Sequence, residues 1–147
     1  MEPKYKEEDL LNHDAVGAVI KDKNGKILMQ NHIKLGFWTL PVGKVKRGQS
    51  IEEGLKEEIF EECDLKITKF TELKNRNYEY LRQGNKVNVF LHLFEIQEFS
   101  GEMKNKEPEK HSEQKFISLE EIKKLSYLSD LTLFYLEHLG FVREAYL

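Results

Sequence analysis

The sequence predicts an α/β protein of the α+β type, with a mixed β-sheet between α-helices on its two faces. Apolar segments with the length and alternation of β-strands occur in both halves of the chain. A regularly spaced apolar stripe over residues 51–63 predicts a helix between them, and two more helices are predicted near the C-terminal end. Strands on both sides of a central helix, followed by terminal helices, favour a sheet covered on both faces.

Length and composition predict one domain over residues 1–147. The 147 residues are 39% hydrophobic and 33% charged, which is typical of a globular protein with a real core. A net charge of −3 gives no electrostatic reason to bind nucleic acid or an anionic membrane. Cys63 is the only cysteine, which excludes an intramolecular disulfide and a cysteine-cluster metal site. Since neither a signal-peptide pattern nor a membrane-spanning apolar run is present, we expect a cytoplasmic protein.

The N-terminal third predicts a β-hairpin followed by a loop. AVGAVI (15–20) and KILMQ (26–30) are strand-like, and Asn24-Gly25 between them is a sequence favoured in hairpin turns. The next segment, HIKLGFWTLPVG (32–43), contains two glycines and a proline, which favours a loop. Trp38 within it is expected to pack under the Leu-Pro turn.

The centre of the chain predicts two long strands, over residues 66–81 and 86–96, joined around Gln83-Gly84-Asn85. Tyr78 and Tyr80 alternate with polar residues on the first strand, so they share one face. That face either lines a pocket or joins the core, and we expect at least one of the two tyrosines to pack.

The C-terminal part predicts a loop, a short strand and two helices. Residues 100–114 are polar and rich in turn residues, and KFISL then forms a short strand. SLEE (118–121) matches a capping box that opens a helix. A second helix is predicted over 129–140, with Gly140 as its stop signal.

The central helix carries glutamates of two kinds. Ser50 is a natural N-cap, Glu53 completes a capping box with it, and Glu52 favours the positive end of the helix dipole. Glu58 and Glu62 instead lie beside or inside the apolar stripe, one turn apart, with Glu61 to one side.

Carboxylates on that face need a counter-charge. Like charges one turn apart repel, and an unpaired carboxylate on a partly buried face is unfavourable. A hard divalent cation such as Mg²⁺ is the simplest remedy. The alternative is an ordinary surface helix whose counter-charges come from basic residues nearby: Lys44, Lys46, Arg47 and Lys56.

Residues 43–65, GKVKRGQSIEEGLKEEIFEECDL, resemble the Nudix box, with Gly43 and the three glutamates in register. FWTLPVG resembles the segment that precedes this box, and KNKEPEKHSEQKFISLEEI resembles the Glu-Pro loop and strand–helix of MutT-like members. The resemblance covers about residues 14–140 and implies the Nudix fold. Gln49, Glu57 and Asp64 depart from the pattern, which has glutamate, arginine and glycine there. The family's bracing ion pair cannot form, but the amide of Gln49 can donate to Glu57, and Asp tolerates the left-handed conformation.

The resemblance implies a pyrophosphohydrolase that uses Mg²⁺ or Mn²⁺ to cleave a nucleoside di- or triphosphate or a nucleoside diphosphate derivative. Glu58, Glu61 and Glu62 would be the catalytic residues and metal ligands, with the carbonyl of Gly43 as an additional ligand. Glu61 is the preferred general base, and Glu113 from a loop is the alternative.

Other residues are assigned to the small-molecule substrate with less support. His32, Lys34, Lys44 and Glu113 are the candidates, although ordinary loop polarity explains His32 and Lys34 as well. Because Gln49 and Glu57 depart from the box, a catalytically impaired nucleotide-binding or regulatory module remains the alternative function. The terminal helices also offer a surface for a homodimer.

Overall fold

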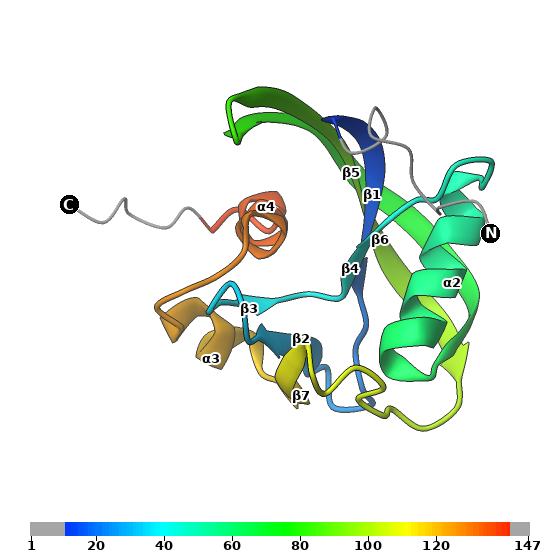
Figure 1. Cartoon of the computed structure of the whole chain (residues 1–147). Helices are drawn as coiled ribbons and strands as arrows, with labels where there is room; N and C mark the ends of the chain where they lie inside the picture. The colour runs from blue at the N-terminus through cyan, green and yellow to red at the C-terminus, as the bar shows by residue number, and fades with distance from the viewer. Residues whose placement is uncertain (1–10, 142–147) are drawn as a thin grey trace.

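The computed structural model describes residues 11–141, and its elements follow one another as Figure 1 shows. The helices and strands are β1 (Asn12–Val19), β2 (Ile27–His32), β3 (Trp38–Thr39), β4 (Val42–Lys44), α2 (Ile51–Cys63), β5 (Lys66–Arg82), β6 (Asn85–Ser100), β7 (His111–Ile117), α3 (Leu119–Lys124) and α4 (Asp130–His138). Within this range no helix is long and apolar enough to cross a membrane. The prediction of one domain over 1–147 extends to end residues that lie outside the described ones.

The strands form two sheets. The first has the order β4-β1-β6-β5 and is mixed, since β1 runs parallel to β6 and antiparallel to β4. β5 and β6 form the predicted long hairpin, and its turn places Gln83 and Gly84 at positive φ, as a tight hairpin turn requires. The second sheet, β3-β2-β7, is antiparallel and lies below the first in Figure 1.

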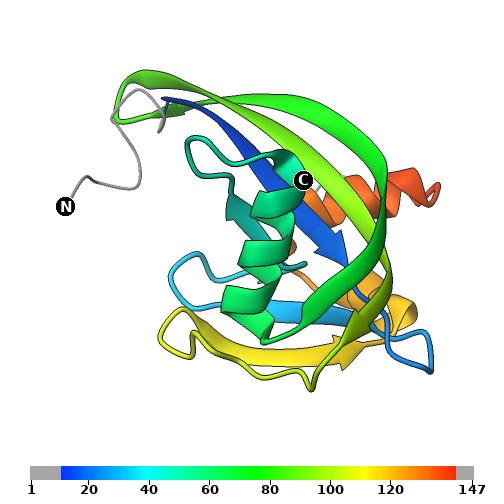
Figure 2. The ribbon, with the colours of Figure 1, turned by 90° about the vertical axis from the view of Figure 1, so that its right-hand side faces the viewer.

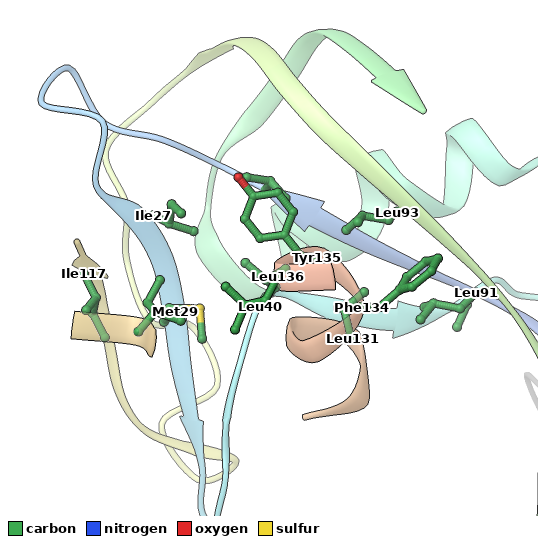
Figure 3. Close-up of a cluster of buried hydrophobic side chains, with 13 residues drawn as sticks. Ile27, Met29, Leu40, Leu91, Leu93, Ile117, Leu131, Phe134, Tyr135 and Leu136 are labelled. Carbon is green, nitrogen blue, oxygen red and sulfur yellow. The ribbon is translucent and has the colours of Figure 1, made fainter. Parts of the chain in front are cut away.

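Helices cover both faces of the mixed sheet, as predicted. Side chains alternate along β1, so Ala15 and Val19 join the core on the α4 side, whereas Val16 and Ala18 join the core against α2. Figures 1 and 2 show α2 and α4 on opposite sides of β1 and β6. Figure 3 shows the α4 side, where Phe134 packs near Leu91 and Leu93 of β6. The predicted α+β class is confirmed.

The predicted hairpin between 15–20 and 26–30 is only partly correct. The turn forms, because the amide of Asp22 donates to the carbonyl of Lys26 at 2.9 Å and Gly25 has a φ of 79°. The strands then separate into different sheets, and only a short bridge from Lys21 to Ile27 joins them. The physical reason is that both edges of β1 are already occupied, by β4 and β6, so β2 pairs with β3 and β7 instead.

Three other boundaries differ from expectation. The expected loop over 32–43 contains the short strands β3 and β4, because this segment passes from the second sheet to the first and pairs with each. The strand expected at KFISL begins earlier, at His111, because its first residues already pair with β2; these residues are polar and lack a strand-like apolar pattern. β6 likewise continues to Ser100, because its last residues still pair with the start of β5.

Several packing expectations are confirmed. The Tyr78 ring packs edge-on against Phe134, with centroids 6.2 Å apart, whereas Tyr80 is exposed. Trp38 packs against the core on the α4 side. Cys63 is fully buried, and burial raises the pKa of its thiol, so it behaves as a small apolar side chain.

Candidate functional site

The start and end of α2 follow local sequence rules. The hydroxyl of Ser50 accepts from the amide of Glu53 at 3.1 Å, and the Glu53 carboxylate accepts from the amide of Ser50 at 3.3 Å. This reciprocal pair is the predicted capping box. Asp64 ends the helix with a φ of 61°, the left-handed conformation expected of it. Glu52 and Glu53 are therefore explained by the helix start and leave the other glutamates for chemistry.

Glu62 is the most unusual carboxylate of α2. Its side chain is 1% exposed, and neither carboxylate oxygen makes a hydrogen bond. The side-chain amide of Gln30 lies near enough to lower the pKa of this carboxyl group. The nearest cation is the ammonium of Lys110, 3.7 Å from Oε1. Burial raises the pKa of Glu62 to about 8, against the opposing effect of Lys110. A buried carboxylate without donors is a group that a cation would satisfy.

Glu58 lies one turn earlier and packs against the backbone of β4. A Cβ added to Gly43 would clash with the Glu58 carboxylate, so only glycine leaves room for that side chain. Burial, together with the charge of Glu61, raises the pKa of Glu58 to about 7, against the opposing effects of Lys110 and Lys46. The structure therefore brings Gly43, Glu58 and Glu62 together on the side of α2 that faces the protein.

Glu61 is half-buried and contacts a lysine that precedes the helix. The ammonium of Lys46 lies 3.2 Å from Oε1 of Glu61 and also contacts Glu57. The Gln49 amide donates to Glu57, which is the contact expected from the altered box. The sequence predicts Lys46 only as a general counter-charge, because nothing in the local pattern shows which carboxylates it reaches.

The carboxylates fit a divalent cation, although they are not arranged as a finished cage. Within residues 11–141, no three His, Cys, Asp or Glu side chains already converge on one point as metal ligands. The fit rests on the hydrogen-bond-free oxygens of Glu62 and on the space that Gly43 leaves beside Glu58. Oxygen donors of this kind suit Mg²⁺ or Mn²⁺.

The loop after β6 supplies charged neighbours that the sequence did not single out. Glu107 raises the pKa of both Glu58 and Glu62, and Lys110 lowers both, so both loop residues lie within electrostatic reach of the site. The backbone supports this placement, because the amide of Lys106 donates to the carbonyl of Glu62 at 3.2 Å. Only the contact between this loop and the end of α2 identifies them.

Glu113, a predicted site residue, is not brought to these carboxylates. It lies on β7 opposite Asn31, and its carboxylate is 3.7 Å from the ammonium of Lys115. The next residue, Gln114, donates to the Glu62 carbonyl at 3.1 Å. Because neighbouring side chains alternate on a strand, Glu113 points to the opposite face of the sheet.

The three predicted basic residues fall into two groups. His32 ends β2, where its ring lies edge-on to His111 with centroids 5.6 Å apart. Burial lowers the pKa of His32, and Lys110 and Lys34 lower it further, so these three basic residues are electrostatic neighbours. Lys44 is different: it follows Gly43 on β4, and alternation directs it away from the face of Gly43 that meets Glu58.

A layer of buried polar side chains supports the end of α2. Gln114 donates to Oε1 of Gln30 at 2.7 Å, in addition to its bond to the Glu62 carbonyl. The His111 ring is 2% exposed, and burial lowers its pKa to about 4. These side chains, whose roles the sequence did not predict, fix the Glu62 backbone against the second sheet. Figure 2 shows the ribbon of α2 beside that sheet. The signal for this layer in the sequence is that the first residues of β7, His111 to Gln114, are polar where a strand usually has apolar residues.

Comparison with known proteins gives a family match. The family model described as the NUDIX domain matches residues 11–135. No match was found among curated proteins.

Solved structures give the same result. A MutT NUDIX hydrolase from Burkholderia pseudomallei is 25% identical, with a TM-score of 0.71 over 86% of this chain and 97% of that chain. The MutT protein from Methanosarcina mazei Go1 is 23% identical, with a TM-score of 0.73 over 88% and 93% of the two chains. A C. elegans Ap4A hydrolase is 22% identical, with a TM-score of 0.60 over 88% and 99%. The last two identities support the fold alone.

Proposed function

The chain belongs to the NUDIX family of pyrophosphate-bond hydrolases. We propose that it is a Mg²⁺- or Mn²⁺-dependent pyrophosphohydrolase of nucleotides. The substrate class is a nucleoside di- or triphosphate or a nucleoside diphosphate derivative. The observation that carries this proposal is Glu62, whose buried carboxylate oxygens make no hydrogen bond beside Glu58 and Gly43. No other carboxylate among the described residues combines such burial with unpaired oxygens.

Each residue has a role that follows from its surroundings. Glu58 and Glu62, which face the protein, would hold the metal together with Glu61, and the Gly43 carbonyl would add a ligand. A bound divalent cation would neutralise the diphosphate and lower the pKa of the attacking water. Glu61 is half-exposed and is the preferred general base, since it can meet both the site and solvent. The loop alternative shifts from Glu113 to Glu107, which lies within reach of Glu58.

The substrate phosphates would meet a basic group beside the carboxylates. His32, Lys34 and Lys110 lie together where β2 meets the start of β7, and the amide of Ile33 donates to the carbonyl of Lys110 at 2.9 Å. The ammonium groups of Lys34 and Lys110 would bind phosphate oxygens, and His32, whose pKa is lowered, would donate a hydrogen bond from its neutral ring. Lys44 is directed away from Glu58 and Glu113 away from Glu62, so any contact that they make with substrate would be on the opposite faces of their sheets.

The test is hydrolysis of a nucleotide panel with Mg²⁺ or Mn²⁺, read as release of phosphate or pyrophosphate. Glu58→Gln and Glu62→Gln should lower kcat about 100-fold or more, because each removes a charged metal ligand. Glu52→Gln is the matched control, since it removes an exposed carboxylate from the same helix. Undiminished hydrolysis in both site variants would exclude this assignment.

A nucleotide-binding module without turnover is the second candidate, favoured by the changes at Gln49 and Glu57 and by carboxylates that do not yet converge. Calorimetry that detects nucleotide binding, with no hydrolysis at any metal concentration, would support it. Metal-dependent turnover that is lost in Glu62→Gln would exclude it.

The assembly and location are also proposed. We expect one domain in the cytoplasm, with a homodimer as the assembly that the terminal helices could provide. Size-exclusion chromatography with light scattering would show the mass in solution, and a monomer at micromolar concentration would reject the dimer.

A further inference from the structure

Lys46 lies in a turn that fixes its position before α2 begins. The amide of Gln49 donates to the carbonyl of Lys46 at 3.1 Å, and the amide of Lys46 donates to Oε1 of Gln49 at 3.0 Å. These two bonds close residues 46–49 into a compact unit. The Lys46 side chain therefore leaves from a defined point on the backbone.

The same turn is anchored to the helix through Glu57. The side-chain nitrogen of Gln49, Nε2, donates to the Glu57 carboxylate, and the Lys46 ammonium contacts the same carboxylate. Side-chain exposure is 18% for Lys46 and 34% for Glu57, so the contact is partly shielded from solvent. Lys46, Gln49 and Glu57 form a closed ring, which we call the anchor ring.

The Lys46 ammonium also reaches out of this ring to Glu61, whose Oε1 lies 3.2 Å away. Glu57 and Glu61 are one helical turn apart, where two carboxylates repel each other. The Lys46 ammonium lies between the two carboxylates and offsets that repulsion. It holds the Glu61 side chain through one oxygen atom, Oε1.

The contact of the Lys46 ammonium with Glu57 is supported by further hydrogen bonds, whereas its contact with Glu61 is not. Glu57 and Gln49 form part of a closed ring, whereas the contact that Glu61 makes among residues 11–141 is with the ammonium. A cation that arrives at Glu58 and Glu62 competes with Lys46 for Glu61 alone. Lys46 keeps a carboxylate partner after this exchange, so the exchange does not leave an unpaired, partly buried ammonium.

We propose that Lys46 is a positioning residue: the anchor ring holds its ammonium, which keeps Glu61 beside the site and releases it when a divalent cation binds. This inference rests on the proposed metal site. It gives the altered positions Gln49 and Glu57 a shared role, because both hold the lysine that controls Glu61.

Mn²⁺ affinity of the nucleotide-free protein tests this role, in Lys46→Met, Glu57→Gln and the double variant. Lys46→Met should bind Mn²⁺ about fivefold more tightly, because a competitor for Glu61 is lost, and a partly exposed ion pair supports a change of about this size. Glu57→Gln should bind about fivefold more weakly, because the ammonium then holds Glu61 alone. In the Lys46→Met background, Glu57→Gln should have no further effect.

Two more variants serve as controls. Lys56→Met removes an equal charge from α2 itself, where the lysine lies over the Phe70 ring, and should leave Mn²⁺ affinity unchanged. Lys46→Arg keeps a cation with both partners in reach and should restore the wild-type affinity. Damage to the fold would weaken binding, so tighter binding in Lys46→Met cannot arise from it.

Three results would overturn the role of Lys46: weaker Mn²⁺ binding in Lys46→Met, additive effects in the double variant, or an equal change in Lys56→Met. If the proposed metal site is wrong, the result is different: the wild-type protein and Glu62→Gln would then have the same Mn²⁺ affinity, or neither would bind Mn²⁺. The two failures are therefore distinguishable within one set of titrations.

Discussion

At the scale of single residues, Glu62 is the side chain whose surroundings the proposed metal site explains best. Folding places its carboxylate among apolar and polar groups that give it no hydrogen bond. A protein with no use for that charge would be more stable with an amide or an apolar side chain there, because burial of a carboxylate is unfavourable. The cost is explained if the carboxylate is held for a cation.

Glu62→Gln should therefore stabilise the metal-free protein and flatten its pH dependence. Burial raises the pKa of Glu62 from 4.5 to about 8. Between these values the folded protein keeps a proton that the unfolded chain releases, so the free energy of unfolding falls as pH rises. For one such group the fall is about 1.4 kcal/mol per pH unit. The glutamine does not titrate and removes this contribution.

Urea unfolding with a chelator, between about pH 5 and 8, measures the slope. Glu58, whose pKa is raised to about 7, maintains part of the slope in the variant. Glu52→Gln is the matched control, because Glu52 is exposed in the first helical turn. An identical slope in wild type and Glu62→Gln would contradict the burial argument.

At the scale of elements, the site is the contact between α2 and β4. Two glycines let these elements approach, and they do so for different reasons. Gly43 leaves space for the Glu58 carboxylate, whereas a Cβ on Gly54 would lie 2.9 Å from Val45. One glycine therefore serves the site and the other serves apolar packing.

Gly43→Ala should weaken Mn²⁺ binding about 10- to 100-fold, as loss of the surroundings of a metal ligand usually does. The added methyl displaces the Glu58 carboxylate from its position against β4. Gly54→Ala adds the same group to the same interface and should lower stability with little effect on Mn²⁺ affinity. Calorimetric titration and thermal unfolding of both variants provide the comparison. Equal Mn²⁺ affinities in the two variants would show that Gly43 has no special role.

At the scale of the whole molecule, the mixed sheet is covered by a helix on each face. α4 packs so close to β1 that a side chain at Gly17 would clash with it. A Cβ on Gly17 of β1 would lie 2.5 Å from Cδ2 of Leu131. Leu131 belongs to the core that also contains Phe134 and Leu136 (Figure 3). The absence of a side chain at Gly17 thus sets how deeply α4 packs.

Gly17→Ala should destabilise the protein by about 1–3 kcal/mol, the usual cost of an overpacked core. Leu131→Ala in the same chain should relieve this clash, so the double variant should lose less stability than the sum of the two single losses. Urea unfolding of the four proteins measures this coupling. Additive losses would show that the two residues do not meet as described.

The sequence by itself determined what depends on neighbours along the chain. The helix over 51–63, its capping box, the left-handed Asp64 and the β5–β6 hairpin follow from local propensity and periodicity, as predicted. The same periodicity separated the helix-start glutamates from Glu58 and Glu62, because a helix face is set by residue spacing alone. The hydrogen bond from Gln49 to Glu57 was also accessible, since both residues lie within one turn-and-helix segment.

The tertiary structure decided everything that depends on which segments meet. Only strand pairing shows that β1 and β2 enter different sheets and that Glu113 faces away from the carboxylates. Only packing shows that Glu62 is fully buried and that Lys110 is its nearest cation. The physical reason is that burial and charge pairing depend on distance in space, and residues 62 and 110 are brought together by the fold rather than by the chain.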